Sequence, residues 1–510
     1  MALKNLIGHK SKEETLKDFE AFIKTYSTRD FIYFFSQKSV EIYREHIYGD
    51  ETTFGCSMTF PLEYFQYGFY YRTGNVMLLA WDIPNMAYLS IINANDYRKN
   101  VMTEEMVGIG VNLYREYENK HSGSEYLKNA GLPDIHKFVM GMSYEQFKYR
   151  NPEWIYQNFN RNYHILIGSS NINRNKLVDA NMITKELFEL TVEETLAVEW
   201  TVLWLCYNCP APLSLSEKKY RKKDERILTK NNIERIIDYY SVTYEQVRKS
   251  PLGKQIFYSK PFVITQKKRE KLAVSIYLVQ MMLADGLYWL IRDYYHNNQK
   301  GQIFVNAFGG MFEDYFEELV REYLKNDSWH KIPENKKKSA DYYVEFDKAI
   351  FLFELKSGTL GIGAKQQTPD VAQINIFYRR NIEKAYKQLK NSEIEYKGDK
   401  PVIKIFLLYE SMPSNTQMII SSLPELFEGD SNCYVMTIEE LEIFLTTYKK
   451  DRVKFDNIVS KLIKNENGTR HYNSVFEVLR ENQATENMQF TGEKDYFKKI
   501  VCSYIGEYTE

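Results

Sequence analysis

Two charged side chains stand at the end of an apolar segment, 350–356, which reads Ile-Phe-Leu-Phe-Glu-Leu-Lys. If this segment is a β-strand, Glu354 and Lys356 emerge on the same face, because successive side chains alternate between faces. A second run rich in β-forming residues, 339–346, precedes it across a short turn, so the two runs predict a hairpin. Asp341 opens the first run, and counting back through the turn places it toward the same end. The sequence therefore predicts three ionisable groups where the hairpin stops.

An aspartate, a glutamate and a lysine in one place are the groups needed for metal-assisted hydrolysis of a phosphodiester. Two carboxylates offer the hard oxygen ligands that Mg²⁺ (or Mn²⁺) prefers, and Mg²⁺ takes its other ligands from water and substrate phosphate. Bound metal lowers the pKa of a water molecule and neutralises charge growing on the scissile phosphate. A nearby lysine can position the attacking water or stabilise the transition state. The alternative is a surface hairpin whose Glu354 and Lys356 merely pair, which contributes at most about 1 kcal/mol.

With their neighbours, these residues resemble the PD-(D/E)xK nuclease superfamily, to which restriction endonucleases and many recombination and defence nucleases belong. The resemblance covers about residues 300–445, and the proline of the family's name is replaced by alanine. It implies that Asp341 and Glu354 are metal ligands and that Lys356 is the catalytic lysine. It also implies that the carbonyl of Leu355 ligates the metal.

Two flanking segments extend this resemblance. The Phe-Gly-Gly-Met-Phe-Glu segment at 308–313 looks like the first helix of the family, whose glutamate often completes the metal site, and Glu313 is the match. Downstream, the segment 385–389 looks like the helix that in many members carries a glutamine facing the site, which makes Gln388 a supporting residue. The resemblance thus implies a catalytic set of Glu313, Asp341, Glu354, Lys356 and Gln388.

The elements needed to position this set can be predicted from the pattern of apolar and polar residues after about residue 300. Besides the hairpin, we expect a helix at 311–325, a weakly marked strand at 329–336, a helix at 375–390, strands at 402–409 and 433–436, and a helix at 438–447. A mixed sheet flanked by helices accounts for that order.

The length of 510 residues exceeds the size at which a single core stops growing, so several domains are expected. Before about residue 296, apolar residues recur at three- and four-residue spacing, which predicts helices. We therefore predict a large, mainly α-helical N-terminal region at 1–299 that recognises a target, senses a signal or binds a partner. An α/β restriction-endonuclease-like domain with a central mixed sheet follows at 300–447, and a helical extension at 448–510.

The formal net charge of −1 excludes the strongly basic composition of many nucleic-acid-binding proteins. Any surface that binds a polyanion must therefore be a local patch. Any single basic residue is more simply explained as part of the ordinary solvated surface than as a binding residue, because Lys and Arg are mostly exposed. Near the hairpin, the residues expected to contact a nucleic-acid backbone are Lys336, Lys337, Lys338, Lys365, Arg379 and Arg380.

Composition also bears on the compartment. The first residues contain no apolar stretch of the kind found in a signal peptide, and five cysteines are an odd number better suited to a reducing environment. The apolar stretch 272–291 contains Gln280 and Asp285, so we expect a buried helix rather than a membrane span. Cys206 and Cys209 form a Cys-x-x-Cys pair, which we expect to lie at the end of a core helix rather than in a metal or redox site. We expect a cytoplasmic protein that does not enter a membrane.

The predicted function is metal-dependent hydrolysis of nucleic-acid phosphodiester bonds, with DNA favoured over RNA. Bacterial antiviral defence or restriction is the expected setting, by analogy with the superfamily. The alternatives are a ribonuclease and a catalytically inactive nucleic-acid-binding or scaffold protein on the same fold, against which the complete set of site residues argues. The N-terminal region could support a homo-oligomer or a protein partner.

Overall fold

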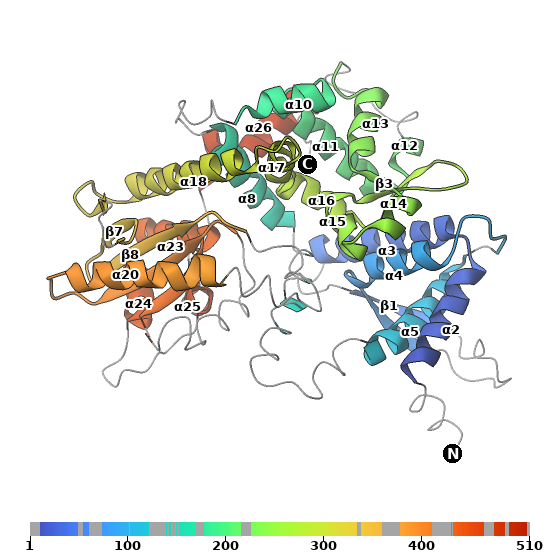
Figure 1. Cartoon of the computed structure of the whole chain (residues 1–510), viewed down its shortest axis with the longest axis horizontal. Coiled ribbons are helices and arrows are strands. Elements are labelled where there is room, and N and C mark those ends of the chain that lie inside the picture. The colour runs from blue at the N-terminus through green and yellow to red at the C-terminus, as the bar shows by residue number, and fades with distance from the viewer. Residues whose placement is uncertain are drawn as a thin grey trace.

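Ordered elements extend along nearly the whole chain in the computed structural model (Figure 1). The residues that the structure describes are 11–48, 55–60, 74–100, 102–121, 139, 142–143, 146, 149, 152–168, 178–215, 226–333, 338–359, 378–410, 430, 432–463, 474–484 and 489–506. Two regions follow one another: helices with two small sheets before about residue 300, and a five-stranded sheet with its own helices after it.

The N-terminal helices form where polar caps precede amphipathic segments. Ser11 and Glu14 make a capping box at the start of α2, each side chain binding the backbone N–H of the other. Phe19 and Ile23 of this helix are fully buried, as expected for residues four apart on one face. The elements of this part are α2 (Lys12–Thr25), α3 (Thr28–Tyr48), α4 (Asp82–Asn93), α5 (Glu104–His121) and the antiparallel strands β1 (Gly55–Phe60) and β2 (Gly74–Leu79).

A second group of helices forms the middle of the molecule. They are α8 (Pro152–Tyr163), η2 (His164–Gly168), α10 (Ala180–Phe188), α11 (Val192–Asn208), α12 (Pro212–Leu215), α13 (Lys230–Tyr239), α14 (Tyr244–Lys249), η3 (Gly253–Gln255), α15 (Ile256–Ser259), α16 (Ile276–Ala284) and α17 (Gly286–Asn297). A three-stranded sheet joins them, composed of β3 (Ser241–Thr243), β4 (Phe262–Ile264) and β5 (Lys271–Ala273).

The prediction of a mainly helical region before residue 300 is confirmed, but its two small sheets were not predicted. The strands of the three-stranded sheet have three residues each, too few to leave a period-two signal, so their pairing depends on contacts made after the helices pack. The strands β1 and β2 have six residues each and were also not predicted. The expected buried helix at 272–291 is two helices, α16 and α17, that meet at Asp285. Cys209 caps the end of α11 and Cys206 is buried, which confirms a core helix end. Among the described helices, none combines the length and apolar character needed to span a bilayer.

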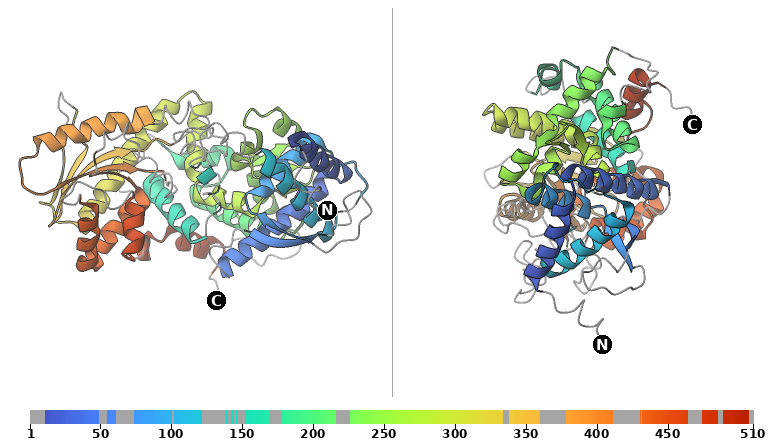
Figure 2. Two further views of the ribbon diagram at one scale, coloured as in Figure 1. Left: turned by 90° about the horizontal axis from the view of Figure 1, so that it is seen from below. Right: turned by 90° about the vertical axis from the view of Figure 1, so that its right-hand side faces the viewer.

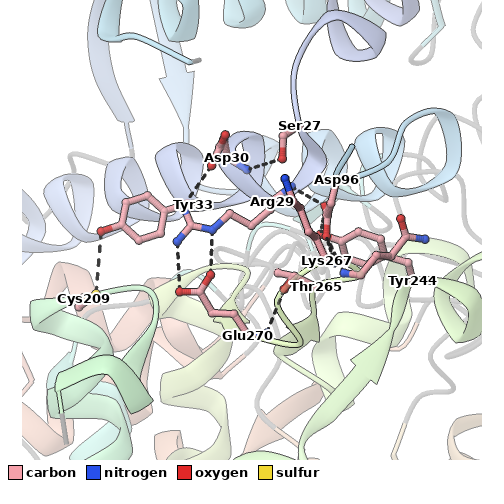
Figure 3. A network of polar contacts seen from close by, with 11 residues as sticks. Ser27, Arg29, Asp30, Tyr33, Asp96, Cys209, Tyr244, Thr265, Lys267 and Glu270 are labelled. Carbon is pink, nitrogen blue, oxygen red and sulfur yellow. Dashed lines mark hydrogen bonds and ion pairs between the residues drawn. The ribbon is translucent and has the colours of Figure 1, made fainter. Parts of the chain in front are cut away.

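A network of polar contacts fastens the N-terminal helices to the connection between β4 and β5 (Figure 3). Arg29 of α3 donates from Nε and Nη2 to the two carboxylate oxygens of Glu270, at 2.8 and 3.1 Å. Asp96 is buried and accepts hydrogen bonds from the backbone N–H of Arg29 and from the hydroxyl of Tyr244. Because both carboxylates are paired, their burial between the elements is not left uncompensated.

The C-terminal sheet has the strand order β10-β9-β8-β7-β6. Its strands are β6 (Trp329–Lys331), β7 (Tyr342–Glu345), β8 (Ile350–Lys356), β9 (Val402–Leu408) and β10 (Cys433–Thr437). The first three pair antiparallel, whereas β8, β9 and β10 run parallel. The mixed sheet and the predicted hairpin are confirmed, and β9 is buried on both faces, as its continuous apolar sequence indicates.

Helices cover both faces of this sheet, as the left view of Figure 2 shows, with α20 and the C-terminal helices on opposite sides of the strands. On one face, Phe316 of α18 (Gly301–Tyr323) packs against Tyr342 and Phe353, and α23 (Ile438–Lys450) packs beside it. On the other face lies α20 (Lys384–Glu395), which continues from the π-helical turn η5 (Tyr378–Glu383) and packs on Leu352. The site residues therefore lie between two layers of helices.

The segment after residue 448 contacts both parts of the molecule. Next to α23 lie α24 (Arg452–Leu462) and α25 (Val475–Glu481), where Phe455 packs on Phe444. The turn η6 (Gly492–Lys494) then leads to α26 (Tyr496–Tyr504), whose Phe497 packs on Phe159 of α8 and Trp200 of α11. This last helix thus packs with the helical region rather than with the sheet.

Buried polar contacts also join the helical region to the sheet. Arg161 of α8 donates from Nε and Nη2 to the two carboxylate oxygens of Glu442 on α23, at 2.6 and 2.7 Å, and both side chains are almost fully buried. The hydroxyl of Tyr315 on α18 donates to the same carboxylate at 2.7 Å. Tyr409, directly after β9, donates its hydroxyl to Asn162. These contacts hold the sheet and the helices at a defined relative position.

Candidate active site

The hairpin brings Asp341 and Glu354 together through its register. Tyr342 pairs with Phe353 at the end of the register, so Asp341, which precedes Tyr342, and Glu354, which follows Phe353, lie at the same end of the hairpin. The backbone N–H of Asp341 donates to the carbonyl of Phe353 at 2.9 Å. The Asp341 carboxylate then accepts the backbone N–H of Leu355 at 2.7 Å. Asp341 is therefore held against β8 at both its backbone and its side chain.

Glu354 is a buried carboxylate with an incomplete set of partners. Its side chain is 1 % exposed, and its Oε1 atom accepts a hydrogen bond from the ammonium of Lys356 at 2.5 Å. Its Oε2 atom is buried and has no hydrogen-bond partner within 3.5 Å among the described residues. Burial raises the pKa of Glu354 to about 7, against a lowering effect of Lys356. A buried acceptor without a partner carries an unrecovered desolvation cost. Asp82 and Glu199 of the helical region share this feature, so at Glu354 it gains its meaning from the neighbouring Asp341 and Lys356.

The two carboxyl groups influence each other electrostatically. Burial raises the pKa of Asp341, while the N–H of Leu355 and the charge of Lys356 lower it. The charge of Asp341 in turn raises the pKa of Glu354. Two mutually repelling carboxylates beside one ammonium group form a region where an added cation is electrostatically favoured.

Gln388 of α20 approaches the same place from the covering helix. Its Nε2 atom donates to the carbonyl of Ser339 at 3.2 Å, just before the hairpin. It also lies near enough to Glu354 for its amide to lower the pKa of that carboxyl. The structure thus brings together Asp341, Glu354, Lys356 and Gln388.

Glu313 reaches the site from the opposite face, where α18 packs. Its Oε1 atom forms an ion pair with Lys331 and accepts the hydroxyl of Tyr342 at 3.0 Å. The charge of Glu313 raises the pKa of Asp341, so the two carboxylates are close enough to interact through space. In this arrangement the partners of Glu313 are Lys331 and Tyr342 rather than the hairpin carboxylates.

The fit of these residues to a divalent cation is partial. In the part of the chain that the structure describes, no group of three His, Cys, Asp or Glu side chains has an arrangement that could hold a metal ion. The donor chemistry still suits Mg²⁺, because Asp341 and Glu354 are neighbouring hard oxygen ligands and one oxygen of Glu354 has no partner among the residues that the structure describes. Leu355 contributes its N–H to Asp341, and metal ligation by its carbonyl stays a prediction. For Glu313, Asp341 and Glu354 to hold one cation together, the ion pair between Glu313 and Lys331 would have to break.

The basic residues expected to contact nucleic acid are only partly described. Lys338 is exposed with a left-handed backbone (φ 52°), and its carbonyl accepts the side-chain amide of Asn391 at 3.0 Å. The backbone of Arg379 and Arg380 belongs to η5, but their side chains lie outside the described residues. The remaining three also lie outside the described residues: Lys336, Lys337 and Lys365.

Sequence reasoning missed Lys331, Glu317 and Tyr342. The hydroxyl of Tyr342 donates to Glu317 at 2.7 Å as well as to Glu313. Lys331 ends the three-residue strand β6, and its register partner is Tyr342. A strand this short gives little signal, although the spacing of Glu313 and Glu317, one helical turn apart, places them on one face of α18.

A cavity of about 350 Å³ lies elsewhere, in the helical region, beside α12, α13 and strands β4 and β5. Lys271, which lines it, pairs with Glu234 and Asp238, and Glu270 pairs with Arg29. Because most of its charges neutralise one another, this cavity lacks the unpaired carboxylate oxygen found at the hairpin.

Comparison of the chain with protein-family models, with curated proteins and with solved structures found no match.

Proposed function

We propose that this protein is a metal-dependent phosphodiesterase of the PD-(D/E)xK type that hydrolyses nucleic acid, with DNA favoured as substrate. The observation that supports it best is the buried carboxylate of Glu354, which lies near Asp341 and beside Lys356 and has one oxygen without a partner among the described residues. Burying an ionised carboxylate without full pairing destabilises a fold. An arrangement that costs stability and assembles the groups for phosphodiester hydrolysis is better explained by function than by folding.

Each residue has a role in this proposal. Asp341 and Glu354 would hold Mg²⁺ or Mn²⁺, which supplies a water molecule of lowered pKa and a positive charge at the scissile phosphate. Lys356 presents its ammonium beside Glu354, where it can orient the attacking water and stabilise negative charge in the transition state. Gln388 restrains the segment before the hairpin and the carboxyl of Glu354 from the side of α20. Closely packed helices on both faces keep these groups in place.

One observation favours a second candidate, a catalytically inactive nucleic-acid-binding or scaffold protein. Glu313 is occupied by Lys331 and Tyr342, and no three-carboxylate group with metal-binding geometry is found among the described residues. Such a protein would bind nucleic acid without cutting it. A ribonuclease differs only in substrate, so the same assay separates all three.

The test uses the full-length protein with supercoiled plasmid, linear duplex DNA, single-stranded DNA and RNA, each with Mg²⁺, Mn²⁺ or EDTA. Lys356→Met is the test variant. Lys348→Met is its matched control, because Lys348 lies in the turn at the other end of the same hairpin and is exposed. We expect metal-dependent cutting of DNA by the wild type and the control, and at least a 100-fold slower rate for Lys356→Met.

The outcomes separate the candidates. Cutting of RNA alone identifies a ribonuclease. Binding of nucleic acid with no cutting under any metal condition identifies the inactive protein. Equal rates for Lys356→Met and Lys348→Met would show that the hairpin does not carry the chemistry.

A further inference from the structure

One charged side chain next to the hairpin has no role in the mechanism above. Lys331 is the last residue of the edge strand β6, and it faces Tyr342 across the sheet. Its ammonium pairs with the Oε1 atom of Glu313 that also accepts the Tyr342 hydroxyl. Its side chain is 52 % exposed, so the ammonium is accessible from solvent.

Stability does not explain this contact. Lys331 is half exposed and Glu313 is a quarter exposed, and ion pairs that solvent can reach contribute between about 0.2 and 1 kcal/mol. Glu313 already accepts the hydroxyl of Tyr342 and would keep that partner without Lys331. The ammonium can therefore leave Glu313 at small cost.

The net charge of the side chains around the hairpin indicates a function for Lys331. Three carboxylates near the hairpin, Glu313, Asp341 and Glu354, carry one negative charge more than the ammonium groups of Lys331 and Lys356 when all are ionised. The nearby Glu317 does not change this count, because Arg321 pairs with it. A bound Mg²⁺ reverses that excess to one positive charge, which matches the single negative charge of a phosphodiester. Without Lys331, the metal-loaded group would be neutral and would attract a phosphate less strongly.

We propose that Lys331 is a substrate-binding residue that pairs with Glu313 in the metal-free protein and binds a non-bridging phosphate oxygen when metal and nucleic acid are bound. The inference rests on the proposed function. The charges of both Lys331 and Glu313 act on Asp341, so these side chains lie near one another. A phosphate bound at the hairpin is therefore near the ammonium of Lys331. A lysine suits this exchange because its ammonium is a compact charge on a flexible stem and moves between oxygens without a backbone change.

The test compares Lys331→Met, Lys331→Arg and the control Lys348→Met in full-length protein. Binding to a duplex oligonucleotide is measured with Mg²⁺ in the cleavage-deficient Lys356→Met background, over a series of salt concentrations. For Lys331→Met we expect a dissociation constant raised roughly five- to tenfold and a salt dependence of log K lowered by about 1, the value for one phosphate contact. Lys331→Arg restores binding, because the positive charge remains. Affinity for Mn²⁺ alone, measured by calorimetry, stays equal or becomes tighter when the competing ammonium is removed.

Three results would overturn the inference. If the wild type cuts DNA but Lys331→Met binds it with unchanged affinity and salt dependence, Lys331 does not touch the substrate, while the proposed function stands. If Mn²⁺ affinity falls in Lys331→Met, Lys331 supports the metal ligands instead. If the wild type neither binds nor cuts DNA or RNA with any metal, the proposed function fails and this inference fails with it.

Discussion

Glu442 and Glu354 are both buried carboxylates of the C-terminal region, yet their surroundings differ. Glu442 lies where the sheet meets the N-terminal helices, and it accepts two N–H groups of Arg161 and the hydroxyl of Tyr315. Glu354 lies where the hairpin ends, with one oxygen bound to Lys356 and the other without a partner among the described residues. Asp96, in the network of Figure 3, resembles Glu442, because its two oxygens accept four hydrogen bonds.

The difference separates two uses of buried charge. Glu442 and Asp96, which join parts of the fold, accept three and four hydrogen bonds, because each unpaired acceptor in the interior costs stability. At the hairpin end, incomplete pairing leaves a carboxylate oxygen that a divalent cation can use. Neither buried charge nor a missing partner identifies a functional site alone, since Asp82 and Glu199 of the helical region also bury a carboxylate oxygen that has no partner among the described residues. What distinguishes Glu354 is the second carboxylate and the ammonium beside it.

The largest effect on stability is expected from breaking the buried ion pair between Arg161 and Glu442. In Arg161→Met, Glu442 loses its cation in the interior, and we expect the free energy of unfolding to fall by about 3–5 kcal/mol. Urea titration and the thermal midpoint measure it. Lys461→Met, which removes a more exposed pair with Glu481, should cost less than about 1 kcal/mol. The double variant Arg161→Met/Glu442→Leu should recover part of the loss, and equal losses in Arg161→Met and Lys461→Met would contradict the comparison.

The second prediction concerns the unpaired carboxylate and pH. The folded protein raises the pKa of Glu354 from 4.5 to about 7, so it holds this proton more tightly than the unfolded chain does. The stability present below pH 4.5 is then lost as pH rises through about 7, and the loss amounts to roughly 3 kcal/mol at pH 8. The raised pKa of Asp341 acts in the same direction. Glu354→Gln should remove most of this pH dependence.

Unfolding in EDTA at pH 5 and pH 8 measures this effect. Wild type should be less stable at pH 8, and Glu354→Gln should be more stable than wild type there while losing metal-dependent cleavage. Mg²⁺ should raise the thermal midpoint of the wild type at pH 8 and leave that of Glu354→Gln unchanged. A variant less stable than wild type at pH 8 in EDTA would show that the carboxylate is well compensated.

The smallest effect is expected for a neutral contact between the two regions. Tyr409 donates its hydroxyl to Asn162, while its backbone N–H donates to the carbonyl of Lys356 at 3.1 Å. Tyr409→Phe removes only the hydroxyl, so we expect a loss of about 1 kcal/mol in stability and a cleavage rate within twofold of wild type. Chemical denaturation and a plasmid-cutting assay measure both. A large fall in cleavage without loss of stability would show that this contact couples the helices to the site.

Several parts of the C-terminal region could be predicted because their signals are local. Strand β8 is an apolar run, and the alternation of its side chains put Glu354 and Lys356 on one face before any fold was known. The tight turn between the two runs set the register, which pairs Tyr342 with Phe353 and so leaves Asp341 and Glu354 at the same end of the hairpin. Gln388 was expected only from the resemblance of its helix to one that carries a glutamine facing the site in the nuclease superfamily, and the structure places it on α20 near Glu354.

The surroundings of Glu313 could not be predicted in the same way. Its position on a helix was expected, but its partners are Lys331 on a strand of three residues and a tyrosine of the hairpin. Neither Lys331 nor Tyr342 carries a local signal for this contact. The three-stranded sheet of the helical region escaped prediction for the same reason, since its strands have three residues each and pair only after the helices have packed.

By itself, the sequence determined the hairpin, the mixed sheet, the helical character of the first 300 residues and the grouping of Asp341, Glu354 and Lys356, because alternation, helical spacing and turns act over a few residues. Only the tertiary structure decided which buried charges are satisfied. Arg161 and Glu442 are 281 positions apart, and α26 returns from the end of the chain to pack on α8 and α11. Such partners are chosen by how whole elements pack, since the energy of a buried charge depends on every group that surrounds it.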